Sequence, residues 1–247
     1  MQDVARAACD VFIAKGYRGA LLTDVAERLE LSHAILYRYV ESKEALLELA
    51  VRYAIDQEAD LTAIVPLATP PKGHLRELLQ GWSATHASFP KLGAALGREP
   101  GEDAAGELAE IIDEFYHFIE DNRLLLSLIK SLVSEYPELS EAYVNARKRP
   151  HTDRIAAYLA GRAAAGRLRS TADPEIAAHF LIESIGWFAW LRKDNPVTAL
   201  IDDRQAHLTV RGLLLSAFVP DARPAPRGGA ASATGGPVPA PVTPGRV

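Results

Sequence analysis

The chain has 247 residues, of which 48% are apolar and 24% charged, a composition typical of a soluble globular protein. Its length allows one large domain or two small ones. The formal net charge of −5 argues against nonspecific coating of nucleic acid, and the single cysteine excludes an internal disulfide and fits a reducing compartment. No apolar run approaches the roughly 20 residues of a membrane helix, and the N-terminus does not resemble a signal peptide. We therefore expect a cytoplasmic protein without membrane contacts.

The first element is predicted to be a helix over residues 3–14, which Gly16 ends as a C-terminal glycine. Cys9 lies inside this helix and is expected to be a small buried thiol rather than a redox switch. The side chains expected to face the core are Val4, Ala8, Val11 and Phe12.

Residues 22–47 predict a short helix, a tight turn, a second short helix and the start of a third. The first of these helices has one apolar stripe, made of Leu22, Val25, Ala26 and Leu29. Ser32 is a suitable N-cap for the second helix, and Ser42 is one for the third, because each hydroxyl can accept a backbone N–H.

The second short helix is predicted over His33–Val40, with Leu36 and Val40 facing the core. The outward side chains are Ala34, Ile35, Tyr37 and Arg38. Aromatic, apolar and guanidinium groups on one exposed arc suit a helix in the major groove of DNA. The alternative is a plain three-helix packing unit with incidental surface aromatics.

Lys43 lies in the first turn of the third helix, where its charge opposes the helix dipole. A DNA phosphate bound at that helix N-terminus would explain the lysine.

Together with Ala7, Ala8, Phe12, Gly16 and Tyr17 upstream, this stretch resembles the DNA-binding domain of TetR-type transcriptional regulators. The further matching positions are Asp24, Val25, Ala26, Leu29, Ser32, Leu36, Tyr37, Tyr39, Ser42, Lys43, Glu44, Leu46 and Leu47. The resemblance covers the first fifth of the chain. It implies an all-α fold, with a helix-turn-helix domain over residues 1–47 and a helical effector-binding and dimerisation domain over residues 48–219. The residues that it implies contact DNA are Thr23, His33, Ala34, Ile35, Tyr37, Arg38, Tyr39 and Lys43.

Several positions depart from the family pattern. Ala20 and Leu21 stand where Thr or Ser is usual, so the helix that follows lacks its hydroxyl cap. Glu30 stands where Gly is common in the turn, which leaves a left-handed turn in question. Ile35 replaces a small or hydroxyl residue and favours an apolar contact over a hydrogen bond, and Val40 replaces a frequent Phe.

Charge gives the N-terminal unit little extra support, since residues 1–52 carry seven Lys or Arg and eight Asp or Glu. Three cations lie near the proposed groove: Arg18, Arg38 and Lys43. So few phosphate-facing cations imply modest affinity for each monomer. We therefore expect a homodimer that reads two half-sites.

The remainder is also predicted to be helical, because no alternating strand pattern of useful length is present. The helix from Ser42 is expected to reach about Leu61, and the family resemblance implies that it relays a signal to the DNA-binding unit. Prolines 66, 70 and 71 then form a linker. Later helices are expected over residues 73–88, 92–96, 103–135, 140–165, 173–194 and 204–218.

Two prolines mark helix geometry in this part. Asp173 and Pro174 together predict the start of a helix, with Asp173 as the N-cap and Pro174 in the first turn. Pro150 is expected to kink the helix over residues 140–165. That helix and the helix over residues 173–194 resemble the dimerising pair of the family, with Phe180, Ile185 or Trp187 against the partner.

Aromatic and polar side chains gather on the helices that enclose an effector pocket in this family. The expected pocket residues are Trp82, His86, Phe115, Tyr116 and Phe118. Such a mixture suits a mid-sized organic ligand, although the aromatics could simply be core. Trp82 and His86 are one turn apart and are the first choice for the pocket wall.

Two sets of carboxylates and histidines recur at four-residue spacing. These sets are Asp113, His117 and Asp121, and Glu175, His179 and Glu183. Each could be a partial metal site, but such sets are more often solvated, so we expect no metal and no cofactor.

Residues 220–247 contain seven Pro and five Gly and are predicted to be a disordered tail. We interpret the whole chain as a homodimeric repressor, not an enzyme, that binds a near-palindromic DNA operator and is released by a small-molecule effector. Two alternatives remain. One is an all-α enzyme or small-molecule carrier with a purely structural N-terminal unit, and the other is an activator or a repressor without an effector.

Overall fold

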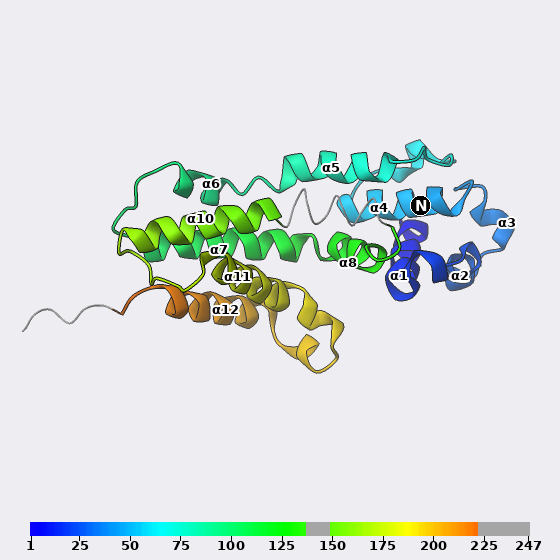
Figure 1. The fold of residues 1–247 in the computed structure, drawn as a ribbon. Helices are drawn as coiled ribbons and strands as arrows, with labels where there is room; N and C mark the ends of the chain where they lie inside the picture. Colours follow the sequence, from blue (N-terminus) through cyan, green and yellow to red (C-terminus); the bar gives the residue numbers. More distant parts are fainter. Residues whose placement is uncertain (137–148, 222–247) are drawn as a thin grey trace, which may run out of the picture.

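The computed structural model describes residues 1–136 and 149–221, and this part of the chain is all-α, as predicted, with no strand (Figure 1). Three short 3₁₀ turns complete it, at Leu61–Ile64, Leu191–Asp194 and Thr198–Leu200. The α-helices are α1 Gln2–Gly19, α2 Leu22–Arg28, α3 His33–Leu36, α4 Lys43–Ile55, α5 His74–His86, α6 Pro90–Leu96, α7 Ala104–Asp121, α8 Arg123–Leu132, α10 Arg149–Ala164, α11 Pro174–Ala189 and α12 Asp203–Phe218.

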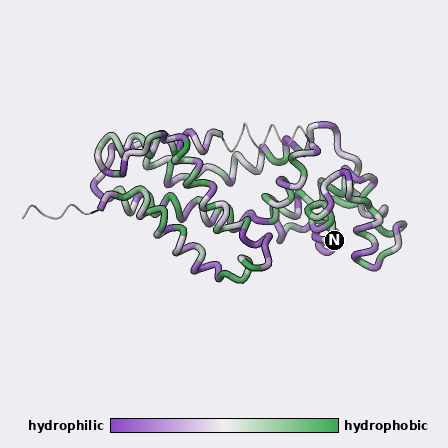
Figure 2. The backbone as a smooth tube through the Cα atoms, turned by 60° about the horizontal axis from the view of Figure 1, so that its bottom comes forward, coloured by the Kyte–Doolittle hydropathy of each residue, from purple (hydrophilic) through white to green (hydrophobic). Residues whose placement is uncertain are grey.

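The helices bury two hydrophobic cores, one toward each end of the elongated molecule (Figure 1). The first core contains side chains of α1–α4, one face of α5 and most of the apolar side chains of α8. The second core is formed by α6, α7, α10, α11 and α12. Hydrophobic and hydrophilic stretches alternate along most of these helices, as amphipathic helices require (Figure 2).

The break in α1 shows why a glycine ends its regular part. Gly16 has φ 68° and ψ 179°, a backbone conformation that is essentially restricted to glycine. The residues predicted to face inward, Val4, Ala8, Val11 and Phe12, are all buried. Cys9 is also buried, with its Sγ 3.3 Å from the Ala50 carbonyl oxygen, and burial raises the pKa of its thiol to about 12. The thiol is therefore part of the core, as predicted.

The single helix predicted over residues 103–135 is wrong, because the chain breaks at Asn122 into α7 and α8. The Asn122 side-chain amide donates a 2.7 Å hydrogen bond to the Phe118 carbonyl, one turn earlier. Such side-chain bonds compete with the backbone ladder of a helix. The break places α8 against α1 and α4, while α7 stays in the second core.

The helix from Ser42 is also shorter than predicted, since α4 ends at Ile55 rather than near Leu61. The Asp56 carboxylate accepts a 3.0 Å hydrogen bond from the Glu58 backbone N–H, a local turn that replaces the next helical turn.

Two predicted caps are confirmed. Ser42 accepts from the Ala45 backbone N–H at 3.1 Å, and Asp173 accepts from the two N–H groups that follow Pro174. The first part of the helix predicted over residues 140–165 and nearly all of the predicted tail lie outside the described residues. Pro150 occupies the first turn of α10.

A buried ion pair joins α7 to α10. Arg162 donates from Nε to Glu107 at 2.6 Å and from Nη2 to the carbonyl of Ala95 in α6 at 2.6 Å. Arg98 donates to the other oxygen of the Glu107 carboxylate at 2.9 Å. Burial alone would raise the pKa of Glu107, but the hydrogen bonds from the two arginines outweigh it and hold this pKa below its usual value.

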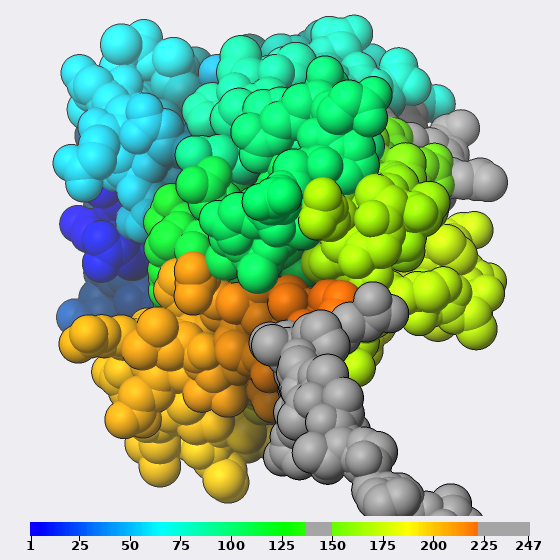
Figure 3. All heavy atoms as spheres, turned by 90° about the vertical axis from the view of Figure 1, so that its left-hand side faces the viewer, coloured from blue at the N-terminus to red at the C-terminus, as the bar shows by residue number. Residues whose placement is uncertain are grey.

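α12 packs against α7 and α11 along one side of the molecule (Figure 3). Over residues 1–136 and 149–221, no helix combines the length and the apolar character that crossing a membrane requires.

Candidate functional site

The helix-turn-helix unit consists of α2 and α3, joined by a turn at Glu30. Glu30 has φ 54°, so this glutamate adopts the left-handed conformation for which glycine is the common choice. The chain therefore makes the turn despite the departure from the family pattern.

The start of α2 has no hydroxyl cap, but it keeps the carboxylate half of a capping box. Asp24, three residues on, accepts a 2.9 Å hydrogen bond from the Leu21 backbone N–H. The same carboxylate is 2.8 Å from the Lys15 ammonium. The hydrogen bond from Lys15, followed by that from Leu21, lowers the pKa of Asp24. Thr23 is half-buried in the same turn.

The second helix of the unit is shorter than predicted, because α3 ends at Leu36 and a turn follows it. Leu36 and Val40 are fully buried, as predicted. Beyond the turn, the Tyr39 carbonyl accepts a 2.8 Å hydrogen bond from the Leu67 N–H, and the Leu67 carbonyl accepts one from Glu41. These bonds to the segment after α4 hold the end of the recognition segment, which we define as residues 32–39.

The recognition segment presents a continuous exposed surface. Ile35 and Tyr37 are 37% and 49% exposed, which is high for large apolar side chains, and the Tyr37 ring meets the His33 ring edge to face at 5.0 Å. Tyr39 is half-buried. The other exposed side chains here are Ser32, Ala34 and Arg38. Ser32 makes no side-chain cap, contrary to the prediction, so its hydroxyl also belongs to this surface.

Lys43 has partners within the protein. Its ammonium is 3.3 Å from the Arg18 carbonyl oxygen and 4.5 Å from the centroid of the Tyr17 ring. The Tyr17 hydroxyl in turn donates to Glu44 at 2.7 Å, and burial together with this carboxylate raises the pKa of Tyr17. These contacts explain a lysine at a helix N-terminus without a phosphate, so a DNA contact of Lys43 stays a prediction.

A mainly apolar pocket of about 130 Å³ lies in the second half of the molecule, among α7, α8, α10 and α11. This volume is close to that of an apolar cavity that holds one benzene ring. Phe89 and Phe115 stack in its wall with ring centroids 3.9 Å apart. The lining residues are Ala87, Phe89, Phe115, Phe118, Ile119, Leu126, His151, Ile182, Glu183, Gly186, Trp190 and Leu191.

Two of the five predicted pocket residues, Phe115 and Phe118, line this pocket, and the other three do not. Trp82 belongs to the first core and stacks on Phe118 at 6.0 Å, one layer behind the wall. His86 is exposed and stacks on the outer side of Trp82 at 5.8 Å.

Tyr116 points to a different side of α7. Its ring stacks on His207 of α12 at 4.2 Å, and its hydroxyl donates to the Asp203 carbonyl at 3.3 Å. Asp113 also faces α12, where it pairs with His207 at 2.8 Å and with Arg211 at 3.1 Å. Within the described ranges, no group of three or more His, Cys, Asp or Glu side chains could hold a metal ion.

Sequence reasoning missed most of the wall. Phe89 precedes a proline that signals a helix start, and it adopts φ 48° as the N-cap of α6. Nothing in the local pattern shows that its ring faces α7. Trp190 lies about a hundred residues further on, where its Nε1 donates to Ser127 of α8 at 2.7 Å.

Comparison with known proteins agrees with this arrangement. Residues 4–50 match the family model for bacterial regulatory proteins of the tetR family, and residues 106–212 match the model for the C-terminal domain of AefR-like transcriptional repressors. No curated protein matches the chain.

Among solved structures, the ketosteroid transcriptional regulator KstR2 of Mycobacterium tuberculosis is similar, with a TM-score of 0.54 and 15% identity over 88% of this chain and 94% of that one. A tetR-family regulator from Rhodococcus RHA1 is 22% identical, with a TM-score of 0.48 over 87% of this chain and 94% of the other. At these identities, the likeness to KstR2 shows the shared fold alone.

Proposed function

Because the chain belongs to the TetR family of transcriptional regulators, we propose that it is a homodimeric repressor, released from a near-palindromic operator by a small, mainly apolar effector. The family and the fold are those of transcriptional regulators, not of enzymes. The observation that carries the proposal is the recognition segment, which is exposed on one side and anchored in the first core on the other.

The anchoring explains how the segment could enter a groove as a rigid unit. Buried Leu36 and Val40 hold its inner side, and the backbone bonds between Tyr39 and Leu67 hold its end. Arg38 and the hydroxyls of Ser32 and Tyr37 remain outside, where they can reach phosphates and base edges.

The proposed dimer uses α11 and α12, which lie together on one side of the molecule (Figure 1). Ile176, Phe180 and Trp187 are exposed along α11, and Leu208 and Leu213 are exposed along α12. We call these five side chains the apolar stripe. A second copy of the chain is its proposed occupant, because an operator with two half-sites requires two recognition segments at a defined distance.

This assignment revises the predicted pair of dimerising helices. The exposed side chains of α10 include Ala157, Ala160 and Ala164. These side chains are small and offer a partner little apolar area. Ile185, predicted as a candidate for the interface, is fully buried in the subunit's own core. The interface is therefore proposed on α11 and α12 in place of α10 and α11.

The proposed effector site is the pocket lined by Phe89, Phe115, Phe118 and Trp190. Its small size and aromatic wall favour a ligand with one ring or a short acyl chain. An effector releases the operator only if it binds the DNA-incompetent state more tightly than the DNA-bound state.

The experiment that tests the function is a footprint on the DNA that flanks the gene of this chain. We expect protection of two half-sites whose centres are about 34 Å, or one helical turn, apart. A reporter driven by that DNA should be repressed by the protein. Absence of a specific footprint would contradict the proposed DNA binding, and a reporter activated by the protein would contradict the repressor role.

A further inference from the structure

We propose that the recognition segment reads thymine methyl groups through Ile35, so that the operator half-site is specified mainly by apolar contact at its centre. The inference rests on the proposed DNA binding and names the base chemistry that this binding recognises.

The first argument is where the N-terminal unit exposes apolar surface. Within residues 1–64, all of which are described, the large apolar side chains that are exposed are Leu21, Ile35 and Tyr37. Two of these three lie on the recognition segment. An exposed isoleucine next to buried Leu36 is unfavourable in the free protein, and it becomes favourable when a partner with apolar groups covers it.

The second argument is the hydrogen-bonding capacity of the recognition segment. Residues 32–39 contain no Asn, Gln, Asp or Glu. The side chains that read adenine with paired hydrogen bonds, Asn and Gln, are therefore absent, as are the carboxylates that accept from cytosine. Arg38 can read guanine, but the Ile35 side chain is a hydrocarbon and can offer a base only apolar contact.

The third argument is rigidity. The Ile35 backbone N–H donates to the Ser32 carbonyl at 2.9 Å, and the next residue, Leu36, is fixed in the core. A β-branched side chain on such a backbone has few rotamers to lose on binding. The only large apolar group on a base edge in the major groove is the C5 methyl of thymine, so thymine is the base that Ile35 fits.

The test begins with selection of binding sites by the full chain from a random duplex library. The enriched duplex is then synthesised with single thymines replaced by deoxyuridine, which removes the methyl group alone. We expect one or two thymines in each half-site to be sensitive to this replacement. There, the loss of the methyl group should weaken binding about fourfold per half-site, because burial of one methyl group contributes about 0.8 kcal/mol. Binding is measured by fluorescence anisotropy.

Two variants complete the design. Ile35→Ala should bind thymine and deoxyuridine duplexes equally well, while Leu21→Ala, the matched exposed apolar side chain outside the recognition segment, should keep the fourfold difference. The inference would be overturned if wild type bound every deoxyuridine duplex with an affinity within twofold of its affinity for the thymine duplex. A methyl effect that persists in Ile35→Ala would also overturn it. A library from which no sequence is enriched would contradict the proposed DNA binding itself, a different result from binding that ignores the methyl groups.

Discussion

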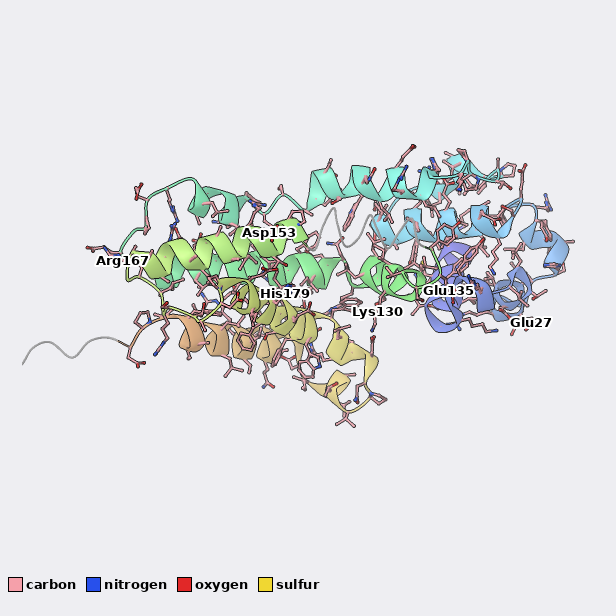
Figure 4. The ribbon with its side chains drawn as sticks, viewed as in Figure 1. Glu27, Lys130, Glu135, Asp153, Arg167 and His179 are labelled. Carbon is pink, nitrogen blue, oxygen red and sulfur yellow. The ribbon has the colours of Figure 1, made fainter. Side chains whose placement is uncertain are left out.

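The Glu135 carboxylate, just beyond α8 (Figure 4), accepts a 2.5 Å hydrogen bond from the backbone N–H of Arg18, at the end of α1. Leu126 of the same helix, α8, lines the pocket, while Tyr136 packs edge to face on Tyr17 at 5.0 Å. α8 and the turn that follows it therefore contact both the pocket and the N-terminal unit. We propose α8 as a route by which an effector shifts the recognition segment, beside the α4 route predicted from the sequence.

The first prediction tests the contact between Glu135 and Arg18. Glu135→Ala leaves the Arg18 N–H without its carboxylate, so hydrogen exchange of this amide should become faster, while overall stability changes by about 1 kcal/mol or less. Exchange measured by mass spectrometry on peptides of α1 and α2 checks this. Ser134→Ala, at the exposed neighbouring position, is the control and should exchange like wild type. Equal exchange in Glu135→Ala and wild type would show that the bond does not hold α1.

The second prediction concerns the polar side of the recognition segment. The double variant Tyr37→Ala, Arg38→Ala should lose roughly ten- to hundredfold in affinity for a selected operator, because both side chains are exposed and proposed to contact DNA. Its thermal midpoint should be nearly unchanged. Arg167→Ala removes one exposed arginine at the opposite end of the molecule and should bind like wild type (Figure 4). Full operator affinity in the double variant would mean that DNA binds to another surface of the protein.

The third prediction addresses the proposed dimer. Phe180 belongs to the apolar stripe and is 55% exposed. The variant Phe180→Glu should therefore leave the fold of the subunit intact but disrupt the dimer interface. We expect monomers in sedimentation velocity at micromolar concentration and a loss of operator affinity. Ile185→Ala is the control, because Ile185 is buried in the core of the subunit. Its truncation should lower the free energy of unfolding by about 2–5 kcal/mol without changing association. A dimeric Phe180→Glu protein, or a monomeric wild type, would contradict the interface.

The fourth prediction concerns the ion pair between Glu107 and Arg162. Arg162→Met leaves the buried Glu107 carboxylate with Arg98 as its remaining arginine partner, and should lower the free energy of unfolding by about 3–5 kcal/mol. Arg98→Ala should cost less than about 1 kcal/mol, because the Arg98 side chain is largely exposed. Urea unfolding at pH 7 measures both. Similar losses in the two variants would mean that burial does not distinguish the two arginines.

The fifth prediction follows from the lowered pKa of Glu107. A carboxylate whose pKa is lower in the folded state stabilises the protein above its unfolded-state pKa, and this stabilisation is lost as the pH falls through the folded-state pKa. Wild type should therefore be more stable than Glu107→Gln at pH 7, and the difference should shrink below the usual pKa of about 4.5 for glutamate. Urea unfolding from pH 7 to pH 3 measures it. A difference that stays constant over this range would show that Glu107 titrates normally.

Local chemistry along the chain was enough to predict much of this protein. The spacing of apolar residues identified the helix-turn-helix unit and its buried Leu36 and Val40, and the caps at Ser42 and Asp173 were readable because a cap is made within three residues. The helical character of the remainder followed from the same periodicity.

Tertiary structure alone decided the rest, because the decisive contacts join residues far apart in the sequence. Phe115 and Phe118 were predicted as pocket residues, but Phe89 and Trp190 became their neighbours only through packing of α6, α7 and α11. The split of one predicted helix at Asn122 is an exception, since the bond from its side chain to the Phe118 carbonyl is local. As a result α8 turned toward α1 and brought Glu135 to Arg18. Periodicity reports which face of a helix is apolar, but the partner of that face depends on the packing of the whole chain.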